Sequence, residues 1–153
     1  MKFSAAVMGA ALLASGVSAG RAIVKNNCQK TVYVQSYPYD GSAPGPLTTV
    51  KTGESFSEDF RAAGSTVKIA TNKNLDGPLF FGYSFSGNPD RAYYEFSTEW
   101  GNPFADSHNV LTPGDGCEQF NCAANQATCY STTAHKIVYG CPQPVDLEAD
   151  LCV

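Results

Sequence analysis

The sequence predicts an all-β fold, a β-sandwich with one short helix that is stapled by three disulfides. Short segments of alternating apolar and polar residues recur along the chain, separated by Gly, Pro, Asn and Asp clusters that favour turns. These segments are not interleaved with helical patterns, so the βαβ rhythm of a parallel sheet is missing. Six cysteines follow an apolar leader, and thiols that reach an oxidising compartment become disulfides.

The alternation predicts seven strands in one domain. In the second strand, Val32 and Val34 face the core and Tyr33 faces outward, because successive side chains of a strand point to opposite sides. The short helix is expected at 118–126, a segment that contains one cysteine and follows another. No linker or internal repeat divides the chain. The expected strands are residues 22–24, 31–37, 55–60, 66–70, 79–85, 92–97 and 136–139.

Residues 1–19 have the pattern of a secretion signal peptide. A positive charge at Lys2 precedes an apolar run, and small side chains stand just before Gly20, so we expect cleavage after Ala19. The apolar run is too short to cross a bilayer, which takes about 20 residues. We therefore expect residues 20–153 to form one domain that is secreted and extracellular and could associate with a cell wall.

The charge balance argues against nucleic acid and anionic membranes as partners. Without the leader, 9 basic and 14 acidic side chains give a net charge of −5 (9 − 14), whereas such partners are usually bound by a basic patch. The isolated His108 and His135, and a cysteine spacing unlike zinc motifs, predict no metal and no other cofactor. A domain of this size can bury a core by itself, so we expect a monomer.

Several motifs in this order resemble thaumatin-like proteins. The mature chain starts with AIVKNNC at 22–28, followed by the strand TVYV at 31–34 and by TGESF at 52–56. The segment CEQFNCAA at 117–124 looks like the Cys-x4-Cys-Ala-Ala segment of the family, and Cys152 lies near the C-terminus. The small size and the cysteine set are most similar to fungal secreted proteins of the Blastomyces yeast-phase-specific (BYS) type. The resemblance implies that residues 20–153 form a thaumatin-like domain of the BYS type.

The resemblance also implies a disulfide pairing, which six cysteines alone leave open. In thaumatin-like proteins the first cysteine closes on the last one, and the cysteine that opens the Cys-x4-Cys segment pairs with the next-to-last. The remaining two cysteines are then expected to join locally. By position in this chain, the implied bridges are Cys28–Cys152, Cys117–Cys141 and Cys122–Cys129.

Some thaumatin-like proteins carry an acidic cleft that binds or weakly hydrolyses β-1,3-glucans. Hydrolysis needs two carboxyl groups about 5 to 9.5 Å apart on either side of one bond. Here Gly82 stands about where the family has one acid, Glu95 matches an acidic position, and Glu99 and Asp106 match loosely. We expect all three acids to be solvated at the surface. A weak β-1,3-glucan hydrolase that uses Glu95 with Asp106 or Glu99 is the alternative.

Aromatic residues are the stronger candidates for a binding surface. Their rings can stack on sugar rings while polar tips hydrogen-bond, although half of an alternating set packs in the core. The candidates are Trp100, in a loop, and Tyr33, Tyr37 and Tyr93 on strands. The sequence therefore favours a small, non-catalytic secreted protein that acts at a cell wall or another extracellular surface. Its expected partner is a cell-wall polysaccharide or a host surface protein.

Overall fold

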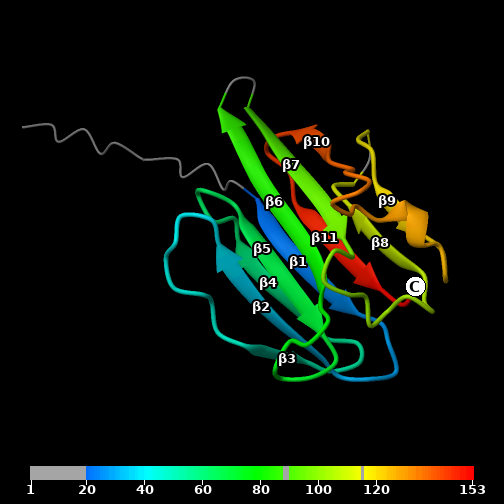
Figure 1. Cartoon of the computed structure of the whole chain (residues 1–153). Coiled ribbons are helices and arrows are strands. Elements are labelled where there is room, and N and C mark those ends of the chain that lie inside the picture. Colours follow the sequence, from blue (N-terminus) through cyan, green and yellow to red (C-terminus); the bar gives the residue numbers. More distant parts are fainter. Residues whose placement is uncertain (1–19, 88–89, 115) are drawn as a thin grey trace, which may run out of the picture.

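The computed structural model describes residues 20–87, 90–114 and 116–153, and the predicted signal peptide, 1–19, lies outside them. Two sheets are stacked face to face (Figure 1). The five-stranded sheet has the order β4 (Ser55–Asp59), β1 (Arg21–Asn26), β11 (Leu147–Leu151), β8 (Asn109–Thr112) and β9 (Phe120–Cys122). The six-stranded sheet has the order β10 (Tyr139–Pro142), β7 (Asp90–Ser97), β6 (Leu79–Gly87), β5 (Ser65–Ala70), β2 (Val32–Pro38) and β3 (Thr48–Val50).

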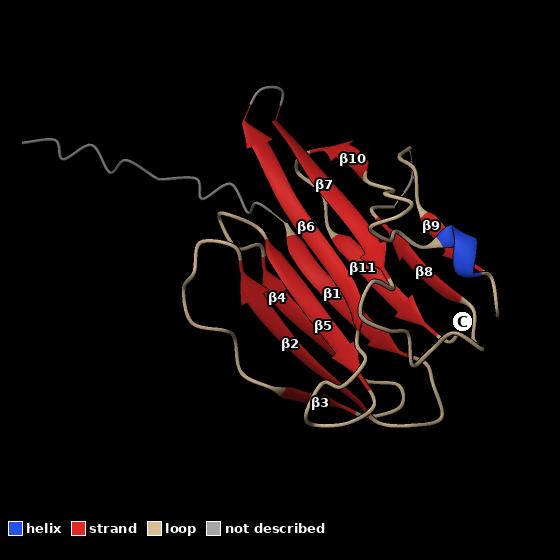
Figure 2. Cartoon of the chain, viewed as in Figure 1, coloured by secondary structure: helices blue, strands red, loops and turns tan. Residues whose placement is uncertain are grey.

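Strands and loops make up almost all of the described chain (Figure 2). Its one helical element is a single 3-10 turn, η1 (Ala127–Cys129). No helix among the described residues is long and apolar enough to span a membrane.

The core fills the space between the sheets. Val32 and Val34 of β2 are fully buried and Tyr33 between them is half-buried on the outer side, as the alternation predicts. The largest buried side chains come from both sheets, so they interdigitate across the sandwich. They include Phe81, Tyr83, Tyr94, Phe96, Phe120, Leu111, Leu147 and Leu151.

Two sequence-based assignments are corrected by the structure. The helix expected at 118–126 is wrong in position, because Phe120–Cys122 pairs with β8 and the helical turn η1 comes after it. Phe120 and Cys122 are buried while Asn121 between them is exposed, which is the period of a strand. The strand expected at 136–139 begins only at Tyr139.

The first and last strands of the domain lie side by side. β1 pairs in parallel with β11, from Ala22 opposite Leu147 to Asn26 opposite Leu151 (blue and red in Figure 1). The disulfide Cys28–Cys152 joins the chain just beyond these two strands. The other bridges are Cys117–Cys141 and Cys122–Cys129, so the pairing is the one that the family resemblance implies.

A polar network between the sheets surrounds Glu58 of β4. Glu58 Oε1 accepts hydrogen bonds from Ser36 Oγ at 2.6 Å and from the Tyr83 hydroxyl at 3.1 Å. Arg61 Nε pairs with Glu58 Oε2 at 3.2 Å, and Ser36 also bonds Ser65. Burial raises the pKa of Tyr83. The network ties β4 of one sheet to β2, β5 and β6 of the other through satisfied polar groups.

Candidate functional site

The outer face of the six-stranded sheet carries the candidate site. Cross-strand pairing places Lys68 of β5 beside Phe80 of β6. Two residues further along the two strands, it places Thr66 beside Gly82. Gly82 is in turn opposite Glu95 of β7. The alternation that buries Leu79, Phe81 and Tyr83 therefore turns this second set outward.

A hollow of about 500 Å³ opens on this face, and we call it the aromatic hollow. Its size is within the range of small-molecule and sugar sites. Strands β2, β5 and β6 supply its floor, and three loops supply its rim: the turn after β2, the loop between β5 and β6, and the loop after β7. It is lined by Tyr37, Pro38, Tyr39, Thr66, Lys68, Leu75, Pro78, Phe80 and Trp100.

Two touching loops hold Trp100 at the rim of the aromatic hollow. A Cβ atom at Gly101 would lie 2.3 Å from the carbonyl oxygen of Gly77, so this close approach of the two backbones requires glycine. The loop of Gly77 is shaped by Asn72, whose Oδ1 accepts hydrogen bonds from the backbone N–H groups of Asn74 and Asp76. The contact fixes the loop that carries Trp100 against the loop that carries Pro78.

The indole of Trp100 is the most exposed large apolar side chain among the described residues, at 67%. Its ring centre lies 6.5 Å from that of Phe80. The ammonium group of Lys68 lies 4.2 Å from the ring centre of Tyr37 and 5.6 Å from that of Phe80. Lys68 thus covers part of Tyr37 and Phe80, and Trp100 presents the open aromatic surface.

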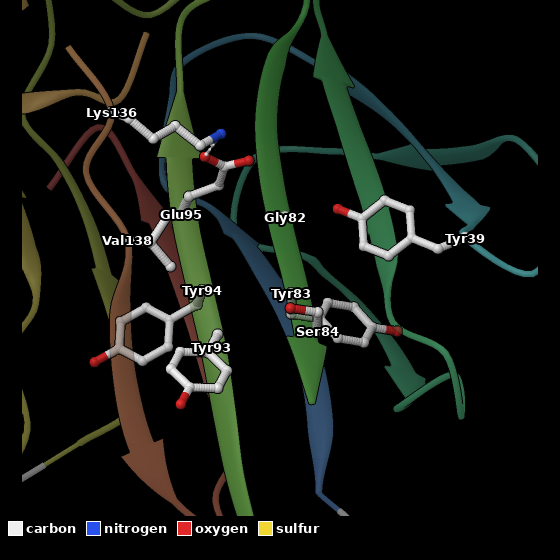
Figure 3. Close-up of a pocket in the computed structure, with 9 residues that line it drawn as sticks. All are labelled: Tyr39, Gly82, Tyr83, Ser84, Tyr93, Tyr94, Glu95, Lys136 and Val138. Carbon is white, nitrogen blue, oxygen red and sulfur yellow. Dashed lines mark hydrogen bonds and ion pairs between the residues drawn. The ribbon is translucent and has the colours of Figure 1, made fainter. Parts of the chain in front are cut away.

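A second, smaller hollow of about 220 Å³ lies next to the aromatic hollow, and we call it the polar pocket. Tyr39 lines both, so the two hollows are adjoining parts of one surface. Figure 3 shows the Tyr39 hydroxyl pointing toward Gly82 from one side and the Glu95 carboxylate from the other. The polar pocket is lined by Tyr39, Gly82, Tyr83, Ser84, Tyr93, Tyr94, Glu95, Lys136 and Val138.

Glu95 is held by cationic and hydroxyl partners. Its Oε2 accepts from Lys136 Nζ at 2.6 Å (dashed in Figure 3) and from Ser131 Oγ at 3.2 Å. A Cβ atom at Gly82 would lie 3.1 Å from Tyr39 Oη and 3.4 Å from Glu95 Oε1. The missing side chain of Gly82 is therefore what leaves the polar pocket open.

The Tyr39 hydroxyl accepts a hydrogen bond from Thr66 Oγ1 at 3.0 Å, which leaves its own proton to donate. Burial raises the pKa of Tyr39, and the nearby Glu95 carboxylate contributes in the same direction. The polar pocket thus offers a neutral donor at Tyr39 and an acceptor at Glu95. This pair suits hydroxyl groups of a ligand.

The other two candidate acids do not join Glu95 in the polar pocket. Glu99 is exposed, and its Oε2 accepts from the Thr133 backbone N–H at 2.6 Å. Hydrogen bonding to the side chain of Thr133 and to this backbone N–H lowers the pKa of Glu99. Asp106 is exposed in another loop and accepts from Ser107 Oγ at 3.3 Å. Glu95 is the one carboxylate among the described residues that line the pocket.

The aromatic candidates from the sequence differ in which hollow they line. Trp100 and Tyr37 line the aromatic hollow, and Tyr93 lines the polar pocket. Tyr33 is half-buried on the same face of β2 but lines neither hollow. Sequence reasoning did not single out Lys68, whose signal was its outward position between the apolar residues Val67 and Ile69.

The two histidines lie apart from this surface. His108 Nε2 contacts Asn121 Oδ1 at 2.5 Å, and the backbone N–H of His135 donates to Thr132 Oγ1 at 3.0 Å. Among the described residues, no group of three or more His, Cys, Asp or Glu side chains is placed to hold a metal ion.

Comparisons with known proteins agree with this architecture. The model of the family of Blastomyces yeast-phase-specific proteins (Bys1) matches residues 9–153. A protein of Arthroderma benhamiae described as an antigenic thaumatin-like protein is 33% identical over 157 aligned positions, which cover 97% of this chain and 77% of that protein.

Two solved structures extend the comparison to three dimensions. The protein elicitor MoHrip2 from Magnaporthe oryzae superposes with a TM-score of 0.86 at 63% identity, over 88% of this chain and 99% of that one. The thaumatin-like xylanase inhibitor TLXI superposes with a TM-score of 0.62 at 14% identity, over 86% of this chain and 99% of that one. The second likeness shows the thaumatin-like fold alone.

Proposed function

This chain belongs to the family of Blastomyces yeast-phase-specific proteins, and from that premise we propose that it is a secreted, non-catalytic protein that binds a polysaccharide at a cell wall or another extracellular surface. The aromatic hollow is the proposed binding site. A host surface protein is the other partner that an experiment should consider.

The observation that carries this proposal is the exposed indole of Trp100 at the rim of the aromatic hollow. Among the described residues, Tyr39 and Trp100 are the exposed aromatic side chains and the others are buried or half-buried, because leaving apolar surface in water is unfavourable. An indole on a loop that a glycine contact holds in place, with open space beside it, is suited to stack on the apolar face of a sugar ring.

Extracellular action is supported by three separate facts. The six cysteines form three bridges, and disulfides persist mainly outside the cytosol. The leader has the pattern of a signal peptide. The relative that is 63% identical is described as a protein elicitor, and the relative from A. benhamiae as antigenic, and both words describe proteins that a host meets.

The surroundings of Glu95 argue for binding over hydrolysis. A glycoside hydrolase needs a second carboxyl group across the bond, and Gly82 is the residue that faces Glu95 on the neighbouring strand. Glu95 Oε2 is already engaged by Lys136 Nζ at 2.6 Å and by Ser131 Oγ at 3.2 Å. Glu95 is better placed to accept a hydrogen bond from a ligand hydroxyl.

The test incubates the purified mature chain with laminarin, insoluble β-glucan and chitin, and measures both pull-down and newly formed reducing ends. We expect binding to at least one polymer without reducing ends. Trp100→Ala should weaken that binding about tenfold and leave the melting temperature unchanged, because the indole is exposed. Tyr33→Phe, on the same face but outside both hollows, is the control and should bind like the wild type.

Glu95→Gln separates the two functions. Under the proposal it retains most of the binding, since an amide oxygen also accepts hydrogen bonds. Reducing ends that the wild type forms and Glu95→Gln does not would establish hydrolysis and overturn the proposal. If none of the polymers is retained and a host surface extract binds instead through Trp100, the partner is a protein.

A further inference from the structure

We propose that Lys68 makes the aromatic hollow selective for acidic polysaccharides, with the carboxylate of a uronate unit facing the Lys68 ammonium. This inference rests on the proposed function and narrows its ligand class. It assigns to Lys68 a specificity role that neither the charge of the whole chain nor the aromatic residues would suggest.

Lys68 has no acidic neighbour on the wall of the aromatic hollow. The residues that line the hollow include one charged side chain, Lys68 itself, and none of the four ion pairs among the described residues involves it. Its ammonium lies over the rings of Tyr37 and Phe80, which supply a weak cation–π attraction but leave the positive charge in place. The hollow is therefore a local site of positive charge on a chain of net charge −4.

The charge of Lys68 contrasts with that of Lys136, the lysine of the adjoining polar pocket. Lys136, in the polar pocket, has its charge matched by Glu95 at 2.6 Å. Of the two lysines that line the hollows, Lys68 is therefore the one that offers an anionic ligand a charge not matched by an ion pair. Specificity of this kind arises where a charge is positioned but not yet paired in the free protein.

The position of Lys68 also matches the shape of a sugar ligand. The ammonium of Lys68 and the indole of Trp100 both lie against Phe80, at 5.6 Å and 6.5 Å from its ring centre. A uronate unit combines an apolar ring face with a carboxylate on the same ring. The hollow presents a stacking surface and a cation to match these two features, while a neutral glucan would use the stacking surface alone.

The geometry of the lysine is restricted before a ligand arrives. Its stem leaves the central strand β5, and the Tyr37 ring that it covers is anchored by a hydrogen bond from its hydroxyl to Gln35 Oε1 at 2.9 Å. A cation that is already ordered loses less side-chain entropy on binding than a freely moving lysine.

The experiment measures binding of the full mature chain to polygalacturonate, to the same polymer with its carboxyl groups reduced to alcohols, and to laminarin. Poly-glutamate serves as a polyanion without sugar rings. We expect the wild type to bind polygalacturonate most tightly. That binding should weaken between about 0.02 M and about 0.5 M salt, because ion pairs at a surface are screened.

Lys68→Met removes the charge and keeps most of the stem. It should weaken binding to polygalacturonate about fivefold, remove most of its salt dependence, and leave binding to the reduced polymer unchanged. Lys68→Arg should restore the preference for the acidic polymer. Lys30→Met is the matched control, since Lys30 also lies over a ring, that of Phe104, but lines neither hollow.

The outcomes separate the inference from the proposed function. Equal binding of the acidic and reduced polymers, or wild-type affinity of Lys68→Met for polygalacturonate, would overturn the inference and leave glycan binding standing. Equally tight binding of poly-glutamate would also overturn it, because charge alone would then suffice. If no polysaccharide binds and Trp100→Ala changes nothing, both the inference and the proposed function fail.

Discussion

The outer faces of the two sheets are built by the same alternation but carry different chemistry. On the five-stranded sheet, β1 and β11 present Lys25, Glu148 and Asp150, and Lys25 Nζ donates to Glu148 Oε1 at 2.6 Å. On the six-stranded sheet, the outward positions hold Lys68 and Phe80 beside the exposed Trp100.

This difference indicates which face has a binding role. Charged side chains that pair with one another are well solvated and keep an outer sheet face soluble. Outward aromatic residues leave apolar surface in water, which costs free energy unless a ligand covers it. We therefore consider the charged face structural and the aromatic face functional, and the following predictions test that division from the largest expected effect to the smallest.

Loss of the Cys28–Cys152 bridge should produce the largest effect. The bridge closes a loop with a sequence separation of 124 residues, and it lies just beyond β1 and β11 of the five-stranded sheet. In the chain-entropy model its removal by a double Cys→Ala change costs about 5 kcal/mol of unfolding free energy. Removal of Cys122–Cys129, with a separation of 7, should cost about 2.5 kcal/mol in the same model. Urea unfolding measures both, and an equal or reversed order would contradict the prediction.

The second prediction contrasts two neighbouring acids on β4. Glu58 faces inward and holds Ser36, Tyr83 and Arg61, whereas Asp59 faces outward with 92% of its side chain exposed. Glu58→Gln should lower the unfolding free energy by about 2 kcal/mol, because the amide nitrogen that replaces Oε2 cannot accept from Arg61 Nε and the ion pair is lost. Asp59→Asn, the matched control, should change it by less than about 0.5 kcal/mol. Equal effects in thermal unfolding would show that the network does not tie the sheets together.

Most of the fold could be predicted because each predicted strand carries its own alternation. Strands β8 and β11 were missed, although Leu147, Ala149 and Leu151 alternate with acids. Glu148 and Asp150 disfavour a strand by their local propensity, and pairing with β1 overrides this preference. The segment 118–126 was expected to be a short helix, because the three residues of β9 are too few to show the period of a strand. Pairing with β8 makes Phe120–Cys122 a strand instead.

The candidate site could be predicted only in part, because it depends on register. The loop around Trp100 indicated exposure from its own turn residues. Tyr33 and Tyr37 have the same local pattern, yet pairing with β5 places Tyr37 at Thr66, beside the hollow, and Tyr33 at Ala70, away from it. The alternation of Lys68 with the buried Val67 and Ile69 indicated only that Lys68 faces outward, and the two rings that it covers, Tyr37 and Phe80, come from β2 and β6.

The third prediction asks whether the two hollows act together. Tyr39→Phe keeps the ring that both hollows share and removes the hydroxyl that points toward Gly82. If a ligand spans both hollows, the lost hydrogen bond should weaken binding about fivefold in a polysaccharide titration. Tyr33→Phe makes the same chemical change outside the hollows and should have no effect. Unchanged affinity of Tyr39→Phe would restrict the binding site to the aromatic hollow.

The smallest effect is expected on the charged face, at Asp150. Burial raises the pKa of Asp150 and the carboxylate of Glu148 raises it further, while Lys25 partly offsets both. Below the unfolded pKa of about 3.9 both states hold the proton and no penalty exists. The unfolded state loses its proton first as the pH rises, so the wild type loses stability between the unfolded pKa and the folded pKa.

Asp150→Asn should therefore match the wild type near pH 3 and exceed its unfolding free energy at pH 7. The difference should be less than about 1 kcal/mol, because solvent screens the repulsion between Asp150 and Glu148. Urea midpoints measured across this pH range check the sign, and a less stable Asp150→Asn at pH 7 would show that the carboxylate stabilises the charged face.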